Sequence, residues 1–247
     1  SLQSFAASQA AGERPLRSAS RRASGPPHTV HLIAMKIAQK TKLPFIADFR
    51  DPWVRGIYRK FPTALHRAVQ RRLERMVVQG ADLVLATSED AVEDFRSRYP
   101  AQPEDKFQFI PNGFDPGEFS RFPHNPPEKE PLTIIHTGNL TLERNPVPLF
   151  RAIAALNRKL SRENPCCRIE LAGLCDNRVR EAAQELLPED SITFSGYLPR
   201  GEVLKKLAGS HLGLLLESFA ENAELVVPGK LYDYLGAGLP VLALVPK

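Results

Sequence analysis

The sequence predicts an α/β protein built on parallel, doubly wound sheets, and three observations lead to this prediction. Short apolar strands alternate with amphipathic helices along most of the chain. Turns that contain glycine and polar residues follow several of these strands. The apolar fraction is 43% of 247 residues, which is enough for a real core. Strands that alternate with helices form parallel sheets, and such sheets bind ligands at the carboxyl ends of their strands.

Composition narrows the class of protein. A length of 247 residues suits one large domain or two of ordinary size. No run approaches the roughly 18 consecutive apolar residues of a membrane span, and the N-terminus does not resemble a secretion signal. Cys166, Cys167 and Cys175 fit neither a disulfide framework nor a metal site, so we expect reduced thiols in a cytoplasmic protein. The net charge of +5 favours anionic partners: nucleotide phosphates, lipid headgroups or nucleic acid.

The N-terminal segment, residues 1–25, is rich in Ser, Ala, Arg and Gly and has no apolar periodicity. We expect a disordered or non-native leader here, without a strand. After it, the pattern becomes regular. The expected elements are a helix over 31–40, a strand over 44–48, a helix over 63–79, and strands over 82–86 and 107–110.

The helix over 63–79 carries apolar and basic residues on different sides. Leu65, Val69, Leu73 and Met76 recur at helical spacing and are expected to face the core. Arg67, Arg71 and Arg75 lie four apart on the other side. Two interpretations remain for this basic side: a solvated face, or a face that binds lipid headgroups.

Five prolines between residues 116 and 131 predict an interdomain linker. Beyond it, strands and helices alternate strictly. The expected strands are 132–136, 168–172, 191–194, 212–216 and 240–244, and the expected helices are 146–160, 177–187, 200–208 and 229–236. This order predicts a parallel sheet with helices on both faces.

The segment VPGKLYDYLGAGLP, residues 227–240, carries the most chemical information. Its turn at Gly229 opens a helix, and a helix N-terminus exposes unpaired N–H groups and a positive dipole that suit phosphate. Lys230 adds a cation, and Asp233 lies one helical turn later, where a carboxylate can accept hydrogen bonds from a ribose.

Together with three other segments, this one resembles the GT-B glycosyltransferases, in particular family 4 (glycosyl transferases group 1). The segments are FIADFRDPW (45–53), IPNGFD (110–115) and IIHTGNLTLERNP (134–146), and all four occur in the order of that family. The resemblance covers roughly residues 24–247. It implies a partial acceptor-side Rossmann-like domain over 26–115 and a nucleotide-sugar-binding Rossmann-like domain over 132–247. It also implies an internal fragment, because such enzymes extend further at both ends.

The resemblance implies a donor site built on the second domain. Gly138 would let the backbone approach a pyrophosphate, and Arg144 and Lys230 would neutralise the leaving nucleoside diphosphate. No DxD-like metal pair lies in a suitable loop, so we expect neither a metal nor another cofactor. The other expected donor-binding residues are Asn139, Gly173, Gly229, Leu231, Asp233 and Glu224, and Gly196 is expected to keep the cleft open.

The acid pair of the family, E-x7-E, is incomplete in this chain. Asp233 matches the second acid, but it is Asp rather than Glu, and Leu225 stands eight residues before it. Glu221 and Glu224 are therefore the candidates to contact the transferred sugar, with Glu217 nearby.

The acceptor side is expected in the FRDPW loop and near a Pro-Pro turn. Asp51 could orient an acceptor hydroxyl, or act as general base if the enzyme inverts. Trp53 could stack on a sugar face, with Arg50 and His28 as further candidates. The alternative is a structural loop in which Arg50 pairs with Asp51 and Pro52 adds rigidity. His136 is expected to pack inside its strand end.

The function expected from these residues is metal-independent transfer of a hexosyl group from a nucleotide-diphosphate sugar to a glycan or lipid-linked acceptor. Cell-surface polysaccharide biosynthesis in the cytoplasm, with peripheral contact at the inner face of the membrane, fits this function. A nucleotide-sugar epimerase of the same fold and a non-catalytic nucleotide-binding module remain as alternatives. A dinucleotide oxidoreductase would need GxGxxG, which is absent, and no aromatic-interleaved basic motif supports nucleic-acid binding.

Overall fold

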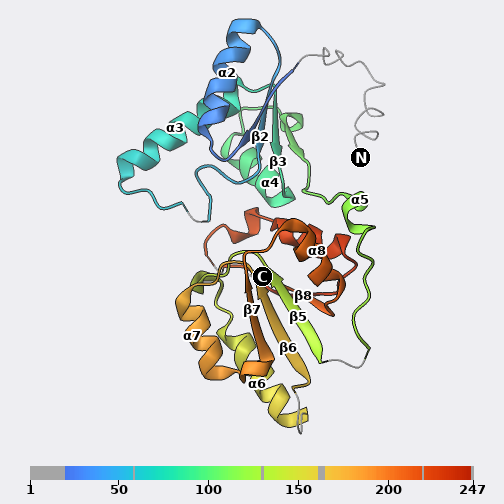
Figure 1. The fold of residues 1–247 in the computed structure, drawn as a ribbon. Coiled ribbons are helices and arrows are strands. Elements are labelled where there is room, and N and C mark those ends of the chain that lie inside the picture. Colours follow the sequence, from blue (N-terminus) through green and yellow to red (C-terminus); the bar gives the residue numbers. More distant parts are fainter. Residues whose placement is uncertain (1–19, 58, 129–130, 161–164, 219, 246–247) are drawn as a thin grey trace. The chain divides into compact units, whose positions relative to one another are not determined.

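The computed structural model describes residues 20–57, 59–128, 131–160, 165–218 and 220–245. Most of the expected leader, residues 1–19, therefore lies outside the described residues. The chain divides into two compact units. The first contains the described residues up to Pro111 together with Glu224–Val226, and the second contains Asn112–Ala223 and the chain from Val227 onward. Each unit is an α/β structure on one parallel sheet (Figure 1).

The first unit has a sheet whose strands follow one another in chain order, β1-β2-β3-β4, and all its pairs are parallel. Its strands are β1 (Arg21–Gly25), β2 (Phe45–Phe49), β3 (Leu83–Ala86) and β4 (Phe107–Phe109). Its helices are α2 (Thr29–Thr41), α3 (Ala64–Gly80) and α4 (Glu89–Arg98), with a 3-10 turn η2 (Glu104–Lys106). Ser88 caps α4 by accepting from the Ala91 N–H.

Strand β1 contradicts the expected leader. Its residues RRASG pair in parallel with β2 from Arg21–Phe45 to Gly25–Phe49. Ala23 and Gly25 are buried, whereas the other side of the strand carries Arg22, which pairs with Asp48 at 2.7 Å. A short edge strand needs little apolar surface, because ladder hydrogen bonds to its neighbour hold it in place.

One core cluster joins all three helices of the first unit to its sheet. Met35 of α2, Val77 of α3 and Phe95 of α4 belong to it, together with Phe45 and Phe49 of β2. Parallel strands that follow one another in chain order need crossovers on one side, since such crossovers are right-handed. The three helices therefore cover the same face of this sheet.

Helix α3 is turned differently from the prediction. Leu65, Val69 and Met76 are 72%, 46% and 43% exposed, so three of the four residues of the expected core stripe face solvent, and only Leu73 packs against the core. The buried residues of α3 are Glu74, Val77 and Val78. In α2, Ile33 and Ile37 are exposed, and His31, Met35 and Ala38 are buried.

The second unit has a five-stranded parallel sheet in the order β7-β6-β5-β8-β9. Its strands are β5 (Leu132–Thr137), β6 (Cys167–Ala172), β7 (Ile192–Gly196), β8 (Leu212–Leu216) and β9 (Val241–Leu244). Its helices are α5 (Pro116–Phe119), α6 (Val147–Leu160), α7 (Asn177–Leu186), α8 (Arg200–Ala208) and α9 (Gly229–Gly236). Three 3-10 turns complete it: η3 (Leu142–Arg144), η4 (Glu189–Ser191) and η5 (Ala223–Leu225), whose last two residues belong to the first unit.

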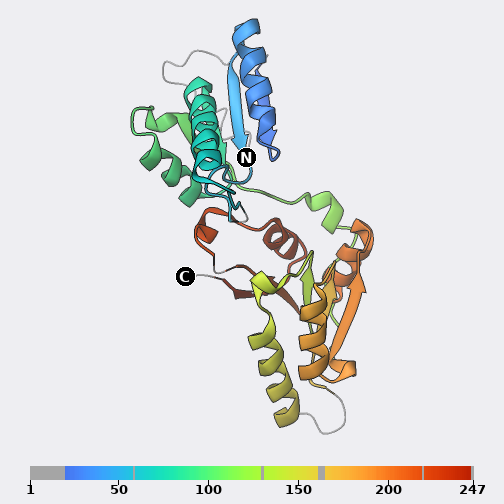
Figure 2. The ribbon, with the colours of Figure 1, turned by 90° about the vertical axis from the view of Figure 1, so that its left-hand side faces the viewer.

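Helices cover both faces of the second sheet, which confirms the doubly wound prediction (Figures 1 and 2). Phe150 of α6 and Val179 of α7 pack in one core cluster, and Leu207 of α8 and Tyr234 of α9 pack in another. The direction of strand order reverses between β5 and β8. This reversal is the topological switch point at which such sheets bind ligands.

The Pro-rich segment is more ordered than a free linker. Residues Pro116–Phe119 form α5, which Asp115 caps by accepting from the Gly117 N–H. Phe119 is buried in the cluster that contains Leu207 and Tyr234. The chain therefore joins the second unit from Asn112 onward, ahead of the boundary that the prolines suggested.

Candidate functional site

Four polar side chains gather at the switch point of the second unit, and we call them the switch-point cluster: His136, Arg144, Glu217 and Lys230. His136 lies in β5, and Glu217 directly follows β8. Arg144 ends η3, and Lys230 is in the first turn of α9. Both sequence-predicted cations are therefore at the same end of the sheet, as expected.

Two glycine turns leave room beside this cluster. Gly138, after β5, has φ +97°, and Gly173, after β6, has φ +145°. A Cβ atom on Gly173 would lie 2.2 Å from the Gly138 carbonyl oxygen, so the two turns pack backbone to backbone. A Cβ atom on Gly138 would lie 3.9 Å from Lys230 Nζ. The Gly138 N–H donates to the Ala172 carbonyl at 2.8 Å, so this glycine provides space rather than a donor.

The Lys230 ammonium group contacts a neutral histidine, His136. His136 Nδ1 lies 3.0 Å from the Leu214 carbonyl oxygen, which can only accept, so Nδ1 carries the proton. The other nitrogen, Nε2, is then an acceptor for the Lys230 ammonium at 3.3 Å. Burial, and next the charge of Lys230, lower the pKa of His136 to about 3. The expectation that His136 packs inside the strand end is confirmed, since the residue is fully buried.

The electrostatics of Lys230 make it a titratable cation. Its pKa is lowered to about 8, first by burial and next by the charge of Arg144, while Glu217 acts in the opposite direction. Most Lys230 ammonium groups are therefore charged at pH 7, but the group loses its proton far more easily than an ordinary lysine.

Arg144 is held from two sides. Its Nη1 donates to the Asn139 carbonyl at 3.1 Å, and its Nε lies 3.6 Å from Glu217 Oε2. The Asn139 side-chain oxygen accepts from the Leu174 N–H at 3.3 Å, which ties the loop after β5 to the loop after β6. Asn139 thus positions Arg144, whereas the sequence suggested only that it binds the donor.

Tyr234 fixes α9 over the sheet, a role that the sequence reasoning missed. Its hydroxyl accepts from the Thr137 N–H at 3.1 Å and donates to the Leu214 carbonyl at 3.0 Å. These two bonds join α9 to β5 and β8, the two strands that flank the switch point. Leu231, a predicted donor-binding residue, is partly buried and packs against the core cluster that contains Tyr234.

Asp233 lies on the same helix but is already paired. Its two oxygens accept from Arg200 at 2.8 and 2.9 Å, and Arg200 also pairs with Glu118 at 3.0 Å. The hydrogen bond to Asp233 is the main cause that raises the pKa of Arg200. Arg200 was not singled out in the sequence, because no motif marks it.

The structure does not bring the guessed acids Glu221 and Glu224 into the cluster. Both are exposed, and Glu224 groups with the first unit. The acid in the cluster is Glu217, whose side chain is 10% exposed. Its position directly after a strand is the signal that could have identified it, since the same rule selected Gly138. The remaining predicted glycines are placed as turns: Gly229 opens α9, and Gly196, with φ +66°, ends β7.

On the acceptor side, Trp53 corrects the prediction. It is 2% exposed, its indole N–H donates to Gln70 Oε1 at 2.7 Å, and it stacks on His28 at 5.1 Å. A ring enclosed in this way cannot stack on a sugar. His28 is 4% exposed and belongs to the same aromatic stack.

Arg50 and Asp51 remain accessible beside this stack. Both are exposed, and backbone bonds anchor the loop, since the Arg50 N–H donates to Gly25 and the Arg50 carbonyl accepts from Thr87. Desolvation raises the pKa of the Asp51 carboxyl, and Arg50 partly counteracts this shift. Arg50 and Asp51 are therefore the acceptor-side candidates that stay in reach of a ligand.

Metal-binding side chains do not gather in the described part of the chain: no group of three His, Cys, Asp or Glu residues could hold an ion there. The three cysteines carry reduced thiols, and Cys167 is buried.

Comparison with known proteins relates part of the chain to a family of glycosyltransferases. Residues 22–118 match the model of Glycosyltransferase Family 4. No curated protein matches the sequence.

Among solved structures, Anabaena Alr3699/HepE in complex with UDP has a TM-score of 0.63 at 16% identity, over 87% of this chain and 57% of that one. Sucrose-phosphate synthase from Thermosynechococcus elongatus has a TM-score of 0.62 at 17% identity, over 87% and 53%. The lipopolysaccharide outer core galactosyltransferase WaaB in its apo form has a TM-score of 0.59 at 18% identity, over 87% and 54%. The chain thus spans little more than half of each structure. The likeness confirms the GT-B fold class.

Proposed function

We infer that this chain, whose residues 22–118 match the model of Glycosyltransferase Family 4, is part of an enzyme that transfers a sugar from a nucleotide-diphosphate sugar. The observation that carries the proposal is the convergence of Arg144 and Lys230 at the switch point of the second unit. Ligands of doubly wound sheets bind at this point, and two cations there suit a diphosphate.

The proposed chemistry is stabilisation of the leaving nucleoside diphosphate. When the bond between the sugar and the diphosphate breaks, negative charge grows on the phosphate oxygens. Lys230, Arg144 and the N-terminus of α9 present positive charge to that place, and they are already oriented by His136, Glu217 and Tyr234. We propose that these groups perform this task without a metal ion.

Asp233 is our candidate for contact with the ribose. Its pair with Arg200 uses one lone pair on each carboxylate oxygen. An ionised carboxylate has about four acceptor sites, so ribose hydroxyls can still donate to it. In this proposal Arg200 orients Asp233 rather than blocks it.

The acceptor is proposed to be a glycan or a lipid-linked sugar. One similar structure contains UDP and another is a lipopolysaccharide galactosyltransferase, which supports a nucleotide-sugar donor and a cell-surface polysaccharide product. Asp51, with Arg50 beside it, would orient the acceptor hydroxyl. We propose a cytoplasmic enzyme with peripheral contact at the inner face of the membrane. In the described residues no helix is long and apolar enough to cross a bilayer.

The test is calorimetric titration of the complete enzyme with uridine, guanosine and adenosine diphosphates. Arg144→Ala and Lys230→Ala should each weaken the best-binding nucleotide about 10–150-fold, because a charge-assisted hydrogen bond contributes roughly 1.5–3 kcal/mol. Matched controls are Arg178→Ala and Lys205→Ala, which remove exposed cations from α7 and α8 and should change affinity less than about threefold.

Turnover then separates the enzyme from the alternatives. A transferase releases nucleoside diphosphate from its donor in proportion to the acceptor glycosylated. Binding without any turnover would indicate a nucleotide-binding module, and interconversion of donor sugars without acceptor would indicate an epimerase. Unchanged nucleotide affinity in both cluster variants would refute the proposed site.

A further inference from the structure

Helix α3 exposes an apolar stripe that the fold of the first unit does not use. Leu65, Val69 and Met76 lie on the solvent side of the helix and are 72%, 46% and 43% exposed. Their spacing places them along one line of the helix, over three turns. Single exposed apolar residues are ordinary, but an aligned set on one helix is a surface feature.

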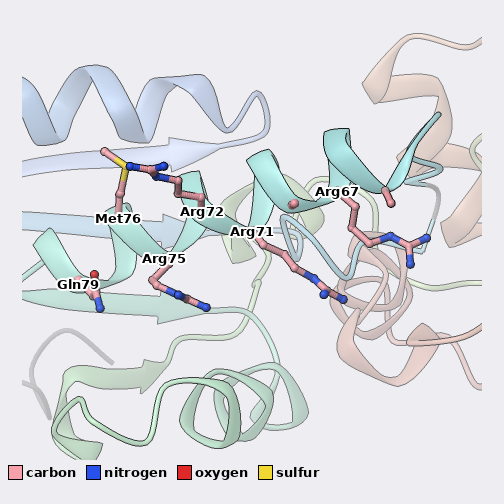
Figure 3. Close-up of a pocket in the computed structure, with 8 residues that line it drawn as sticks. Arg67, Arg71, Arg72, Arg75, Met76 and Gln79 are labelled. Atoms are coloured by element: carbon pink, nitrogen blue, oxygen red, sulfur yellow. The ribbon is translucent and has the colours of Figure 1, made fainter.

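Four arginines lie on one side of this stripe, with Arg72 next to it and Arg67, Arg71 and Arg75 further round the helix. Figure 3 shows Arg67, Arg71 and Arg75 extending in one direction from successive turns of α3, while Arg72 projects beside Met76. They line a shallow groove along the helix together with four uncharged residues: Ala64, Ala68, Met76 and Gln79. All four arginines are exposed.

The charge of this face is uncompensated. The only acid in α3 is Glu74, which is buried and turned inward. There it pairs with Arg98 and accepts from the Tyr99 hydroxyl at 2.7 Å and the Val54 N–H at 3.0 Å. Within the residues that the structure describes, no carboxylate forms an ion pair with Arg67, Arg71, Arg72 or Arg75.

We propose that α3 docks the protein on the surface of an anionic lipid bilayer. Leu65, Val69 and Met76 would enter the interface between headgroups and acyl chains, and the arginines would bind lipid phosphates beside them. Helices that lie in this interface combine an apolar line with flanking Lys or Arg in the same way. This proposal rests on the proposed function, because it specifies which surface makes the membrane contact. The experiment that tests it does not depend on sugar transfer.

Other occupants fit the face less well. Nucleic acid would match the arginines but leave the apolar stripe in water, since α3 has no Phe, Tyr or Trp for base stacking. A second copy of this face would bring four positive charges against four others. A bilayer that contains anionic lipid satisfies both the charge and the apolar line.

The experiment is flotation of the complete protein with vesicles of phosphatidylcholine, with and without phosphatidylglycerol. We expect binding only when phosphatidylglycerol is present. The variant Arg67→Gln, Arg71→Gln, Arg75→Gln should weaken binding on the order of a hundredfold, because each arginine near an anionic surface contributes about fivefold. The variant Leu65→Ser, Val69→Ser keeps every charge and should weaken binding about tenfold or more.

The matched control is on α6. Arg151→Gln, Arg158→Gln, Lys159→Gln removes the same charge from a helix that also exposes Leu156 and Leu160. This control should bind vesicles within about threefold of the unaltered protein. Circular dichroism and nucleoside-diphosphate titration of every variant report folding and the donor site separately.

Three results would overturn the proposal. An equal loss in the α3 and α6 triple variants would mean general charge attraction. Full binding by the Leu65→Ser, Val69→Ser variant would mean ionic adsorption without insertion. Failure to float with phosphatidylglycerol vesicles, together with tight binding of duplex DNA by the same arginines, would assign the face to nucleic acid.

Discussion

At the scale of single residues, Lys230 has the property most open to measurement. Its pKa of about 8 reflects burial next to Arg144, so the free site holds a cation that is ready to lose its proton. A bound diphosphate adds negative charge beside the ammonium and must raise that pKa. Nucleotide binding and protonation of Lys230 are therefore linked.

This linkage predicts the pH dependence of binding. Nucleoside-diphosphate affinity should stay nearly constant below pH 8 and fall above it, approaching tenfold per pH unit, since only the protonated lysine pairs with phosphate. At pH 8 the calorimetric enthalpy should vary with the ionisation enthalpy of the buffer, because protons are taken up. The control Lys230→Arg keeps its charge at every accessible pH. An unchanged pH slope in that variant would assign the titration to another group.

Residue-level prediction succeeded where topology decides position and failed where packing decides it. Gly138, Arg144 and Lys230 follow from strand ends and a helix start, which the apolar pattern marks. The burial of Trp53 depends on Gln70, its partner on α3, and the pairing of Asp233 depends on Arg200, which is far from it in the sequence. No local pattern encodes such partners.

At the scale of elements, α3 shows why a helix can be located but not oriented from its sequence. Two sides of it carry apolar residues: Leu65, Val69 and Met76 on one, Val77 and Val78 on the other. The buried side also has three apolar residues, because Leu73 packs against the core as well. The buried side is selected by Glu74, whose partners Arg98 and Tyr99 come from the end of α4.

Glu74 therefore gives a prediction about the stability of the first unit. Glu74→Gln should lower the free energy of unfolding by about 3 kcal/mol, because it leaves the buried side of Arg98 short of a counter-charge. Asp94 still pairs with Arg98 in this variant. The expected destabilisation is therefore at the low end of the range for removing one partner of a buried ion pair. The measurement is urea unfolding followed by the fluorescence of Trp53, the single tryptophan of the chain.

The matched control for Glu74→Gln is Glu93→Gln on α4. Glu93 forms a pair with Arg96 at 3.8 Å, and its side chain is 74% exposed. Its loss should change the free energy of unfolding by less than about 1 kcal/mol. Equal effects of the two variants would show that Glu74 does not hold α3 in its orientation.

At the scale of the whole molecule, the two units differ in how far the sequence predicted them. In the second unit every strand and the four expected helices lie within about two residues of expectation, because apolar runs and glycine turns alternate clearly. In the first unit β1 was missed, since RRASG has no apolar alternation and only its pairing with β2 makes it a strand.

The first unit should also lose stability in acid. Burial lowers the pKa of His28 and of His31 to about 4, and in the described structure both His31 ring nitrogens lack a hydrogen-bond partner. The unfolded state, with a pKa near 6.5, binds more protons between pH 4 and 6.5, so stability rises with pH in this window. From pH 7 to pH 5 we expect the free energy of unfolding to fall by about 2 kcal/mol per histidine. The measurement is urea unfolding at each pH, monitored by the fluorescence of Trp53.

The control is His31→Phe, which keeps an aromatic ring in the stack with Phe49 and removes one titrating group. It should reduce the loss between pH 7 and pH 5 by about half. If the variant loses as much stability as the unaltered protein, other groups cause the acid sensitivity.

The bond between Tyr234 and the switch-point strands also has a consequence for how this sequence can change over time. Gly213 lies under the Tyr234 ring, and a Cβ atom on Gly213 would come within 2.6 Å of the Tyr234 Cγ atom. A mutation at either position alone is harmful: a larger residue at 213 displaces the ring, and a smaller one at 234 leaves a void and frees two hydrogen-bonding groups. Descendants of this chain should therefore exchange the two positions together or keep both, and in related sequences the pair should covary.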